Sequence, residues 1–207
     1  AASDVYKRQL VNIDLETRLP KSNHRKLNII RIGTSGALQE DIPVDSFVLS
    51  TYGLGFDGLL GFYDVDYSDE EKNLTKAFLQ QTPWPFAANS PYFVKGSNFL
   101  KEKLGDGMHK GITATANGFY GPQGRSLRLG AKVPNLNEYL NRFEYKGNKI
   151  TNFEMETSAL YGLCALLGHE AGTVCAIIAN RFSKSYSKDY KKTVDQLIEL
   201  TLHRLTQ

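Results

Sequence analysis

Asn152-Phe153-Glu154-Met155-Glu156-Thr157-Ser158-Ala159 says most about the fold, because two carboxylates flank a methionine just before an apolar helix. Apolar residues then recur at helical spacing: Leu160, Leu163, Cys164, Leu166 and Leu167. This pattern predicts a buried helix from about Thr157 to Leu167, entered from a loop and ended by Gly168. Glu154 and Glu156 would lie at the mouth of a packed core, where a carboxylate needs a partner. Two interpretations stay open: a sugar-binding pair, and an acidic first turn favoured by the helix dipole.

The segments around this stretch alternate between strand and helix patterns, which favours an α/β fold over an all-β fold. We expect strands at residues 27–32, 46–51, 110–116 and 172–179, and amphipathic helices at residues 68–80 and 190–205. The run Ser68-Asp69-Glu70-Glu71 is typical of a helix N-terminus. The run Thr82-Pro83-Trp84-Pro85-Phe86 is expected at the surface, although its aromatic rings could equally pack against a neighbouring subunit.

The chain shows no internal repeat, low-complexity tract or linker, so residues 10–207 are expected to form a single domain. The first nine residues lack a clear hydrophobic period and do not begin with methionine. We therefore expect residues 1–9 to be a non-native or disordered start. An ordinary mobile terminus is the other interpretation.

The composition is that of an ordinary globular protein, with 41% hydrophobic and 23% charged residues among 207. The 25 basic and 22 acidic residues give a net charge of +3, and the basic residues are scattered, which argues against nucleic acid as the main partner. The sequence has no apolar run of membrane-spanning length and no secretory signal. Cys164 and Cys175 are expected to be small core residues of a protein in a reducing, cytoplasmic compartment.

Two predicted strands end in polar side chains. Arg31-Ile32-Gly33-Thr34-Ser35-Gly36-Ala37 joins a cation and two hydroxyls to two glycines, which let backbone amides approach an anion closely. A plain strand-to-turn transition is the alternative, and the segment lacks the lysine of a nucleoside-triphosphate loop. Ile177-Ile178-Ala179-Asn180-Arg181 ends in an amide and a cation, which would ordinarily be solvated surface.

Gly118-Phe119-Tyr120-Gly121-Pro122-Gln123-Gly124-Arg125 follows a predicted strand and combines aromatic rings with an amide and a guanidinium. Gln123 can both donate and accept hydrogen bonds, whereas Arg125 only donates. Such a set suits the edge of a planar heterocycle. A Gly121-Pro122 turn with two exposed polar residues is the alternative.

Together these four segments resemble the nucleoside phosphorylase family, and within it the pyrimidine-specific uridine phosphorylase branch. The resemblance rests on R-I-G-T-S-G-A at 31–37, F-Y-G-P-Q-G-R at 119–125, N-F-E-M-E-T-S-A at 152–159 and I-I-A-N-R at 177–181, and it extends from about Leu10 to the end. It implies a three-layer α/β/α sandwich around a mixed, partly barrel-like sheet. It also implies a pentosyltransferase of nucleoside catabolism and pyrimidine salvage, which converts uridine and phosphate into uracil and ribose 1-phosphate.

The resemblance implies a role for each matching residue. The phosphate-binding residues would be Arg31 and Thr34. The ribose-binding residues would be Thr34, Met155 and Glu156, with Glu156 on the 2′ and 3′ hydroxyls and Glu154 supporting the loop. The base-binding residues would be Phe119, Gln123 and Arg125, and the catalytic residues would be Arg125, Arg181 and Glu156.

The resemblance makes phosphate a co-substrate and implies no cofactor and no catalytic metal, although a structural potassium ion is possible in intact family members. The partners would be a nucleoside, inorganic phosphate and further copies in a dimer-based hexamer, with no nucleic acid and no membrane. The family's G-D-P-x-R phosphate loop is not found before Leu10, so we expect a chain that lacks the N-terminal segment. A nucleoside-binding or assembly fragment without turnover is therefore the alternative function.

Two other enzymes of this superfamily are less favoured. Bacterial hexameric purine nucleoside phosphorylases carry an aspartate that protonates the purine, at the position of Asn180. Nucleosidases, which use water in place of phosphate, also have an aspartate near the last strand. An amide cannot act as a general acid, so Asn180 argues against both.

Overall fold

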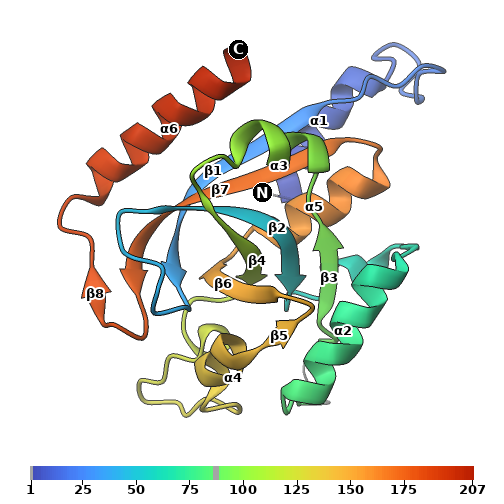
Figure 1. Ribbon diagram of the computed structural model, residues 1–207. Coiled ribbons are helices and arrows are strands. Elements are labelled where there is room, and N and C mark those ends of the chain that lie inside the picture. Colours follow the sequence, from blue (N-terminus) through green and yellow to red (C-terminus); the bar gives the residue numbers. More distant parts are fainter. Residues whose placement is uncertain (1, 86–88) are drawn as a thin grey trace.

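The computed structural model describes residues 2–85 and 89–207 (Figure 1). The strands are β1 (Asn28–Ala37), β2 (Phe47–Gly55), β3 (Tyr92–Lys95), β4 (His109–Thr115), β5 (Glu144–Tyr145), β6 (Asn148–Glu154), β7 (Glu170–Asn180) and β8 (Ser185–Tyr186). The α-helices are α1 (Ala2–Arg8), α2 (Asp69–Gln81), α3 (Asn98–Leu104), α4 (Leu136–Arg142), α5 (Thr157–Leu166) and α6 (Tyr190–Thr206). Short 3-10 helices are η1 (Gln9–Asn12), η2 (Leu59–Phe62) and η3 (Gly121–Gln123).

The strands form one mixed sheet that closes on itself. Its order is β3-β2-β4-β6-β1-β7-β8, and β2 also pairs with β7, so β2, β4, β6, β1 and β7 make a closed barrel. Neighbours in the barrel are parallel, except for the antiparallel pairs β1–β6 and β2–β7. Helix α6 packs on β1 and β7, and α3 packs on β7 and β2. Helix α5 covers β2, β3, β4 and β7 from another side (Figure 1). The predicted α/β class with a mixed, partly barrel-like sheet is confirmed.

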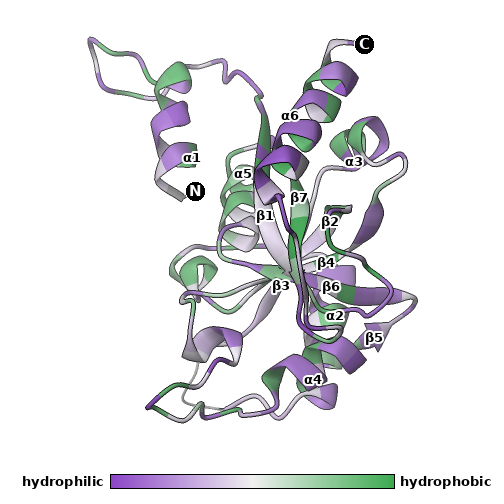
Figure 2. Cartoon of the chain, turned by 90° about the vertical axis from the view of Figure 1, so that its left-hand side faces the viewer, coloured by the Kyte–Doolittle hydropathy of each residue, from purple (hydrophilic) through white to green (hydrophobic). Residues whose placement is uncertain are grey.

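The helix that the sequence predicted from Thr157 to Leu167 is α5, and it ends before Gly168, whose φ of 72° only glycine adopts readily. Figure 2 shows α5 almost wholly in hydrophobic colours, whereas α6 alternates between hydrophilic and hydrophobic turns. The predicted cap of α2 is also present, because Ser68 and Glu71 exchange hydrogen bonds as a capping box. The four predicted strands correspond to β1, β2, β4 and β7.

Some elements differ from the predictions. Strand β6 runs to Glu154, so the loop expected before Thr157 is confined to Met155 and Glu156. The sequence pattern did not indicate β6, because Thr151 and Asn152 are polar but buried and the strand therefore lacks an alternation of apolar and polar residues. Residues 2–8 form α1, with Val5 buried against the cluster that includes α5, where we expected an irregular start. Whether residues 1–9 are foreign to the domain stays a prediction.

The run that begins at Thr82 does not lie wholly on the surface. Thr82 is buried, and the Trp84 ring stacks on Phe56 with centroids 4.5 Å apart. Trp84 therefore packs against the largest hydrophobic cluster of this chain. Phe86 lies outside the described residues.

A chain of buried polar side chains crosses the five strands of the barrel. The hydroxyls of Ser50 and Thr113 are hydrogen-bonded, and Thr113 Oγ1 donates to Asn152 Oδ1 at 2.8 Å. Asn152 Nδ2 donates to Ser35 Oγ at 2.9 Å, and Ser35 in turn contacts the thiol of Cys175. Each barrel strand thus contributes one member. Buried polar groups are tolerated when their partners are present, so this chain of bonds fixes which strands lie side by side.

We predict that Asn152→Ala lowers the free energy of unfolding by about 1–3 kcal/mol, because it removes the acceptor of Thr113 Oγ1 and the donor to Ser35 Oγ from a buried site. The matched control is Asn73→Ala on the exposed face of α2, which should change stability little. Equilibrium urea unfolding of the two variants and the parent measures both effects. Equal stability of Asn152→Ala and the parent would contradict the role given to this amide.

Candidate functional site

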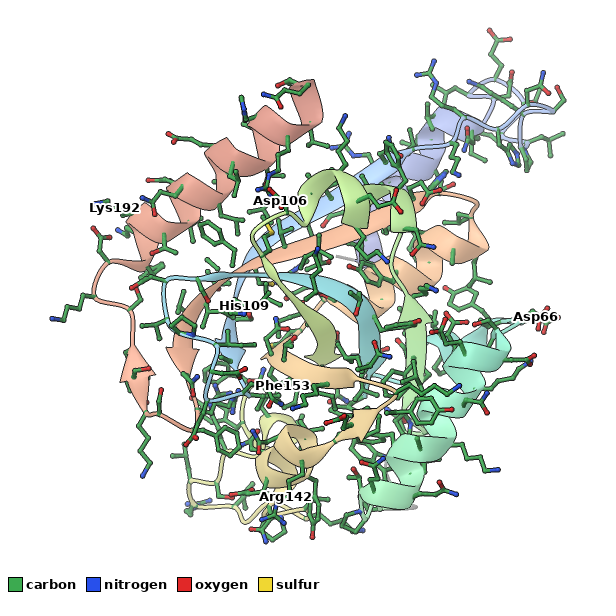
Figure 3. All side chains as sticks on the ribbon, viewed as in Figure 1. Asp66, Asp106, His109, Arg142, Phe153 and Lys192 are labelled. Carbon is green, nitrogen blue, oxygen red and sulfur yellow. The ribbon has the colours of Figure 1, made fainter. Side chains whose placement is uncertain are left out.

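Three of the predicted segments meet where β1 pairs with β6. Only two register pairs join these strands, Gly36 with Phe153 and Ala37 with Asn152. On its other side, β1 ends beside β7, with Ala37 opposite Asn180. Phe153, labelled in Figure 3, belongs to β6 and lies above α4 in that view. The ends of β1, β6 and β7 therefore bring the motifs at 31–37, 152–159 and 177–181 to one place.

The guanidinium of Arg31 lies between two carboxyl groups. Its Nη2 forms an ion pair with Glu156 and stands 3.4 Å from Glu154 Oε2, while Nη1 donates to Cys175 Sγ at 3.2 Å. Gly33 makes this position possible, because a Cβ there would come within 2.5 Å of Arg31 Nη1. The glycine thus leaves room for the side chain to lie across β1, in addition to any approach of an anion to the backbone.

Burial and charge act in opposite directions on this cluster. Burial disfavours the charged guanidinium, but the Cys175 sulfur, which accepts its hydrogen bond, and the carboxyl groups of Glu154 and Glu156 hold the pKa of Arg31 above its ordinary value. Burial raises the pKa of Glu154, against the opposing effects of Arg31 and of the Thr115 hydroxyl. Burial also raises the pKa of the Cys175 thiol, to about 11, so a neutral sulfur faces Arg31 at neutral pH.

Glu154 and Glu156 have different surroundings. Glu154 accepts hydrogen bonds from the backbone amides of Glu156 (2.9 Å) and Thr157 (3.1 Å) and from Thr115 Oγ1 (2.7 Å). It therefore satisfies the free amides at the start of α5, and this fits its predicted role of supporting the loop. The side chain of Glu156 is 36% exposed and available from solvent. Sequence alone left a sugar-binding pair and an acidic first turn open, and the structure gives the helix-start role to Glu154 alone.

The loop after β4 gathers the predicted base-binding side chains around Gln123. This residue is 3% exposed, so the alternative of an exposed polar turn is wrong for it. Gln123 Oε1 accepts from Arg125 Nη1 at 2.5 Å and from Arg181 Nη2 at 2.6 Å. Because these two donors fix the carbonyl end of the amide, its NH₂ end is left as the free hydrogen-bonding group.

Aromatic faces hold both guanidinium groups. Arg125 lies 3.9 Å from the centroid of the Phe119 ring, and Arg181 lies 5.2 Å from that of Phe153. Burial lowers the pKa of Arg125, and burial together with the nearby charge of Arg125 lowers the pKa of Arg181 to about 10. Both arginines remain charged at neutral pH. The predicted stacking face of Phe119 is thus covered by Arg125 in this structure.

A cavity of about 280 Å³ adjoins this cluster, lined by Gly36, Arg125, Asn137, Ala179, Asn180, Arg181 and Tyr186. Among the described residues, two buried polar atoms on its lining have no hydrogen-bond partner: Arg181 Nε and Asn137 Oδ1. One is a donor and the other an acceptor. Such a pair suits a planar ligand or water that can both accept and donate.

Asn180 does not face the solvent, as a lone amide at a strand end ordinarily would. It is 2% exposed, and Nδ2 donates to the carbonyls of Gln39 (2.8 Å) and Ile42 (2.9 Å). Its Oδ1 accepts from the amides of Phe182 (2.9 Å) and Ser183 (3.0 Å). All of its usual hydrogen-bonding capacity is therefore used to join the turn after β1 to the turn that begins at Arg181.

The remaining predicted residues lie nearby, and their roles stay predictions. Met155 is exposed between β6 and α5. Thr34 lies on β1, where side chains alternate, so its hydroxyl starts on the face opposite to Arg31. Sequence analysis did not identify Cys175 or Asn137 as site residues. The register of β7 against β1 places Cys175 opposite Gly33, and no sequence pattern indicated a role for Asn137 on α4.

Within residues 2–85 and 89–207, no group of three or more His, Cys, Asp and Glu side chains could hold a metal ion. The structural potassium ion suggested by the family resemblance stays a prediction. In the same residues, no helix is both long and apolar enough to span a membrane.

The sequence profile of the phosphorylase superfamily matches residues 18–206. The uridine phosphorylase of Thermococcus kodakarensis is 30% identical over 171 residues, covering 79% of this chain and 52% of that protein. That of Haemophilus influenzae is 27% identical over 176 residues, covering 84% and 62%. The DeoD-type purine nucleoside phosphorylase of Colwellia psychrerythraea is 28% identical over 177 residues, with the same coverage. The chain thus spans 52% to 62% of the length of these relatives.

A solved structure has the same fold. It is a Trypanosoma brucei nucleoside phosphorylase, described as showing uridine phosphorylase activity, and it matches with a TM-score of 0.83. The match covers 96% of this chain and 73% of the other, at 24% identity. The α/β nucleoside phosphorylase fold predicted from the resemblance is therefore confirmed.

We predict that Asn180→Asp destabilises the protein by about 1–3 kcal/mol at neutral pH, because carboxylate oxygens would replace the NH₂ group that donates to two carbonyls. Asn73→Asp makes the same chemical change at an exposed position of α2 and should have little effect. Urea unfolding compares the two variants. Parent-like stability of Asn180→Asp would show that this amide does not hold the turns in place.

Proposed function

The chain belongs to the phosphorylase superfamily, and we propose that it binds uridine and phosphate and catalyses their conversion to uracil and ribose 1-phosphate. The observation that carries this proposal is a pair of clusters with complementary chemistry, held by residues on or next to the connected strands β1, β4, β6 and β7. One is Arg31 with Glu154 and Glu156, and the other is Gln123 with Arg125 and Arg181. The first suits an oxyanion and sugar hydroxyls, and the second suits the polar edge of a base.

The chemistry of phosphorolysis agrees with these side chains. Cleavage of the N-glycosidic bond builds positive charge on ribose C1′ and negative charge on the departing uracil. Arg125 and Arg181 would stabilise the negative charge, and Arg31 would hold the phosphate whose oxygen attacks C1′. Glu156 would accept hydrogen bonds from the ribose hydroxyls. Phosphate is itself the nucleophile, so the reaction needs no nucleophilic side chain.

The proposed preference for a pyrimidine rests on Gln123. Its oxygen is held by two arginines, so its NH₂ group and Arg125 present donors to a ligand, and these suit the carbonyl oxygens of uracil. Asn180 cannot protonate a purine, and its amide is committed to four backbone groups. A dimer-based hexamer and a cytoplasmic location belong to the same proposal.

The direct test is release of base from uridine and from inosine by the folded 207-residue chain, with and without phosphate. We expect uracil only when phosphate is present. Hypoxanthine without uracil would overturn the base assignment. Binding of uridine without any release would favour the alternative, a nucleoside-binding fragment without turnover.

Two substitutions should remove activity from the folded protein. Arg125→Ala should lower kcat/KM for uridine by about 10²–10³-fold, the usual effect of removing one donor that stabilises a developing negative charge. Glu156→Gln should cause a loss of similar size through the ribose. Arg128→Ala, an exposed arginine three residues beyond Arg125, is the matched control and should keep the parent rate. Unchanged turnover in either variant would remove that residue from the proposed site.

A third substitution tests the space that Gly33 leaves for Arg31. The methyl group of Gly33→Ala would meet the flexible end of Arg31, so we expect the guanidinium to move while the fold survives. KM for phosphate should rise about tenfold or more, the equivalent of one charged hydrogen bond. Gly61→Ala is the control, because in the described part of the chain no residue other than its immediate neighbours has an atom within 4 Å of the added methyl group. Steady-state kinetics with varied phosphate would contradict the argument if the two variants gave the same KM.

A further inference from the structure

In this structure, the residue proposed for phosphate and the residue proposed for ribose bind each other. Arg31 Nη2 and Glu156 form a direct ion pair. We infer that this ion pair is exchanged for substrate contacts, so that an oxyanion and the ribose hydroxyls bind with positive cooperativity. The inference rests on the proposed function, since it takes from it the ligand of each residue.

Glu156 is the partner of Arg31 that can leave. Glu154 already accepts hydrogen bonds from two backbone amides and a threonine hydroxyl, and its side chain is 2% exposed. Glu156 has a partly exposed side chain at the start of α5. Ribose hydroxyls can therefore reach it without rearrangement of the helix.

Arg31 keeps its place when Glu156 turns away. Nη1 remains bonded to Cys175 Sγ, and Nη2 remains 3.4 Å from Glu154. The guanidinium has five N–H donors, so release of one carboxylate frees donors for an oxyanion without freeing the whole side chain. The ion pair between Arg31 and Glu156 is then broken, so that Arg31 has donors available for an oxyanion and Glu156 accepts hydrogen bonds from the ribose.

Each ligand thus removes an obstacle to the other. An oxyanion that approaches Arg31 is repelled by the negative charge of Glu156. Ribose hydroxyls donate hydrogen bonds to Glu156 and so draw it away from the guanidinium. An oxyanion on Arg31 likewise frees Glu156 for the sugar. Because coupling of two binding equilibria is reciprocal, each ligand should raise the affinity for the other by the same factor, about fivefold or more.

The first experiment measures binding to the parent protein by calorimetry. Sulfate serves as a tetrahedral oxyanion that does not carry out the reaction, and uridine serves as the nucleoside. We expect sulfate to lower the Kd of uridine about fivefold or more, and uridine to lower the Kd of sulfate by the same factor. The matched ligand is 2′,3′-dideoxyuridine, which lacks both hydroxyls and should bind with no dependence on sulfate.

The second experiment uses Glu156→Gln, with Glu170→Gln as control for the loss of one charge. Glu170 pairs with Lys26 at 2.5 Å on the surface. Glu156→Gln should bind sulfate more tightly than the parent and uridine more weakly, and the coupling between them should disappear. Glu170→Gln should match the parent in all three.

Several results would overturn the inference: independent binding of uridine and sulfate, equal coupling for dideoxyuridine, unchanged or weaker sulfate binding by Glu156→Gln, or no sulfate binding by the folded parent. The comparison of uridine with 2′,3′-dideoxyuridine uses the parent protein, so it tests the inference even if a variant fails to fold. None of these measurements depends on turnover. Phosphorolysis without coupling would overturn only this inference, and coupling without phosphorolysis would overturn only the proposed function.

Discussion

The side-chain amide of Asn152 joins strands that the backbone joins only weakly. Two register pairs connect β1 to β6, and the amide adds hydrogen bonds to Ser35 on β1 and to Thr113 on β4. Closure of the barrel at this point depends on these bonds, because an unpaired amide in a buried site costs more than a paired one contributes. The hydrogen bonds of Asn152 also hold the next two residues in place. Phe153 lies under Arg181, and Glu154 accepts a hydrogen bond from the start of α5.

This anchor explains why neighbouring carboxylates have different tasks. Glu154 is the last residue of β6, and its side chain points into the structure. There it accepts hydrogen bonds from the amides at the start of α5, which have no acceptor within the helix. Glu156 comes two residues later, outside the strand and before the first turn of the helix. One acid therefore stabilises the fold and the other remains accessible. The division follows from the end of β6, not from the chemistry of the two identical side chains.

Sequence predicted the parts of this arrangement whose patterns are local. The period of Leu160, Leu163 and Cys164 and the glycine at 168 determine α5. The motif residues form two clusters, one of Arg31 with Glu156 and one of Gln123 with Arg125 and Arg181. The missing parts depend on contacts between distant segments. Because Thr151 and Asn152 are polar but buried, the sequence pattern of β6 does not indicate a strand. The contact of Cys175 with Arg31 depends on the register of β7 against β1. Two of the four partners of Asn180, the carbonyls of Gln39 and Ile42, likewise belong to a distant segment.

The two clusters also differ in charge, in the direction that the proposed reaction needs. Around Arg31, two carboxyl groups face one guanidinium. Around Gln123, two guanidinium groups gather, and in the described part of the chain neither Arg125 nor Arg181 forms an ion pair with a carboxylate. Burial and mutual repulsion lower the pKa of Arg181 to about 10, yet the buried amide oxygen and the aromatic faces keep both cations in place. A nucleoside lying across the β1–β6 pairing would have its base at the positive end and its sugar at the acidic end. Cleavage moves electrons from sugar to base, so this fixed polarity favours the charge distribution of the transition state over that of the ground state.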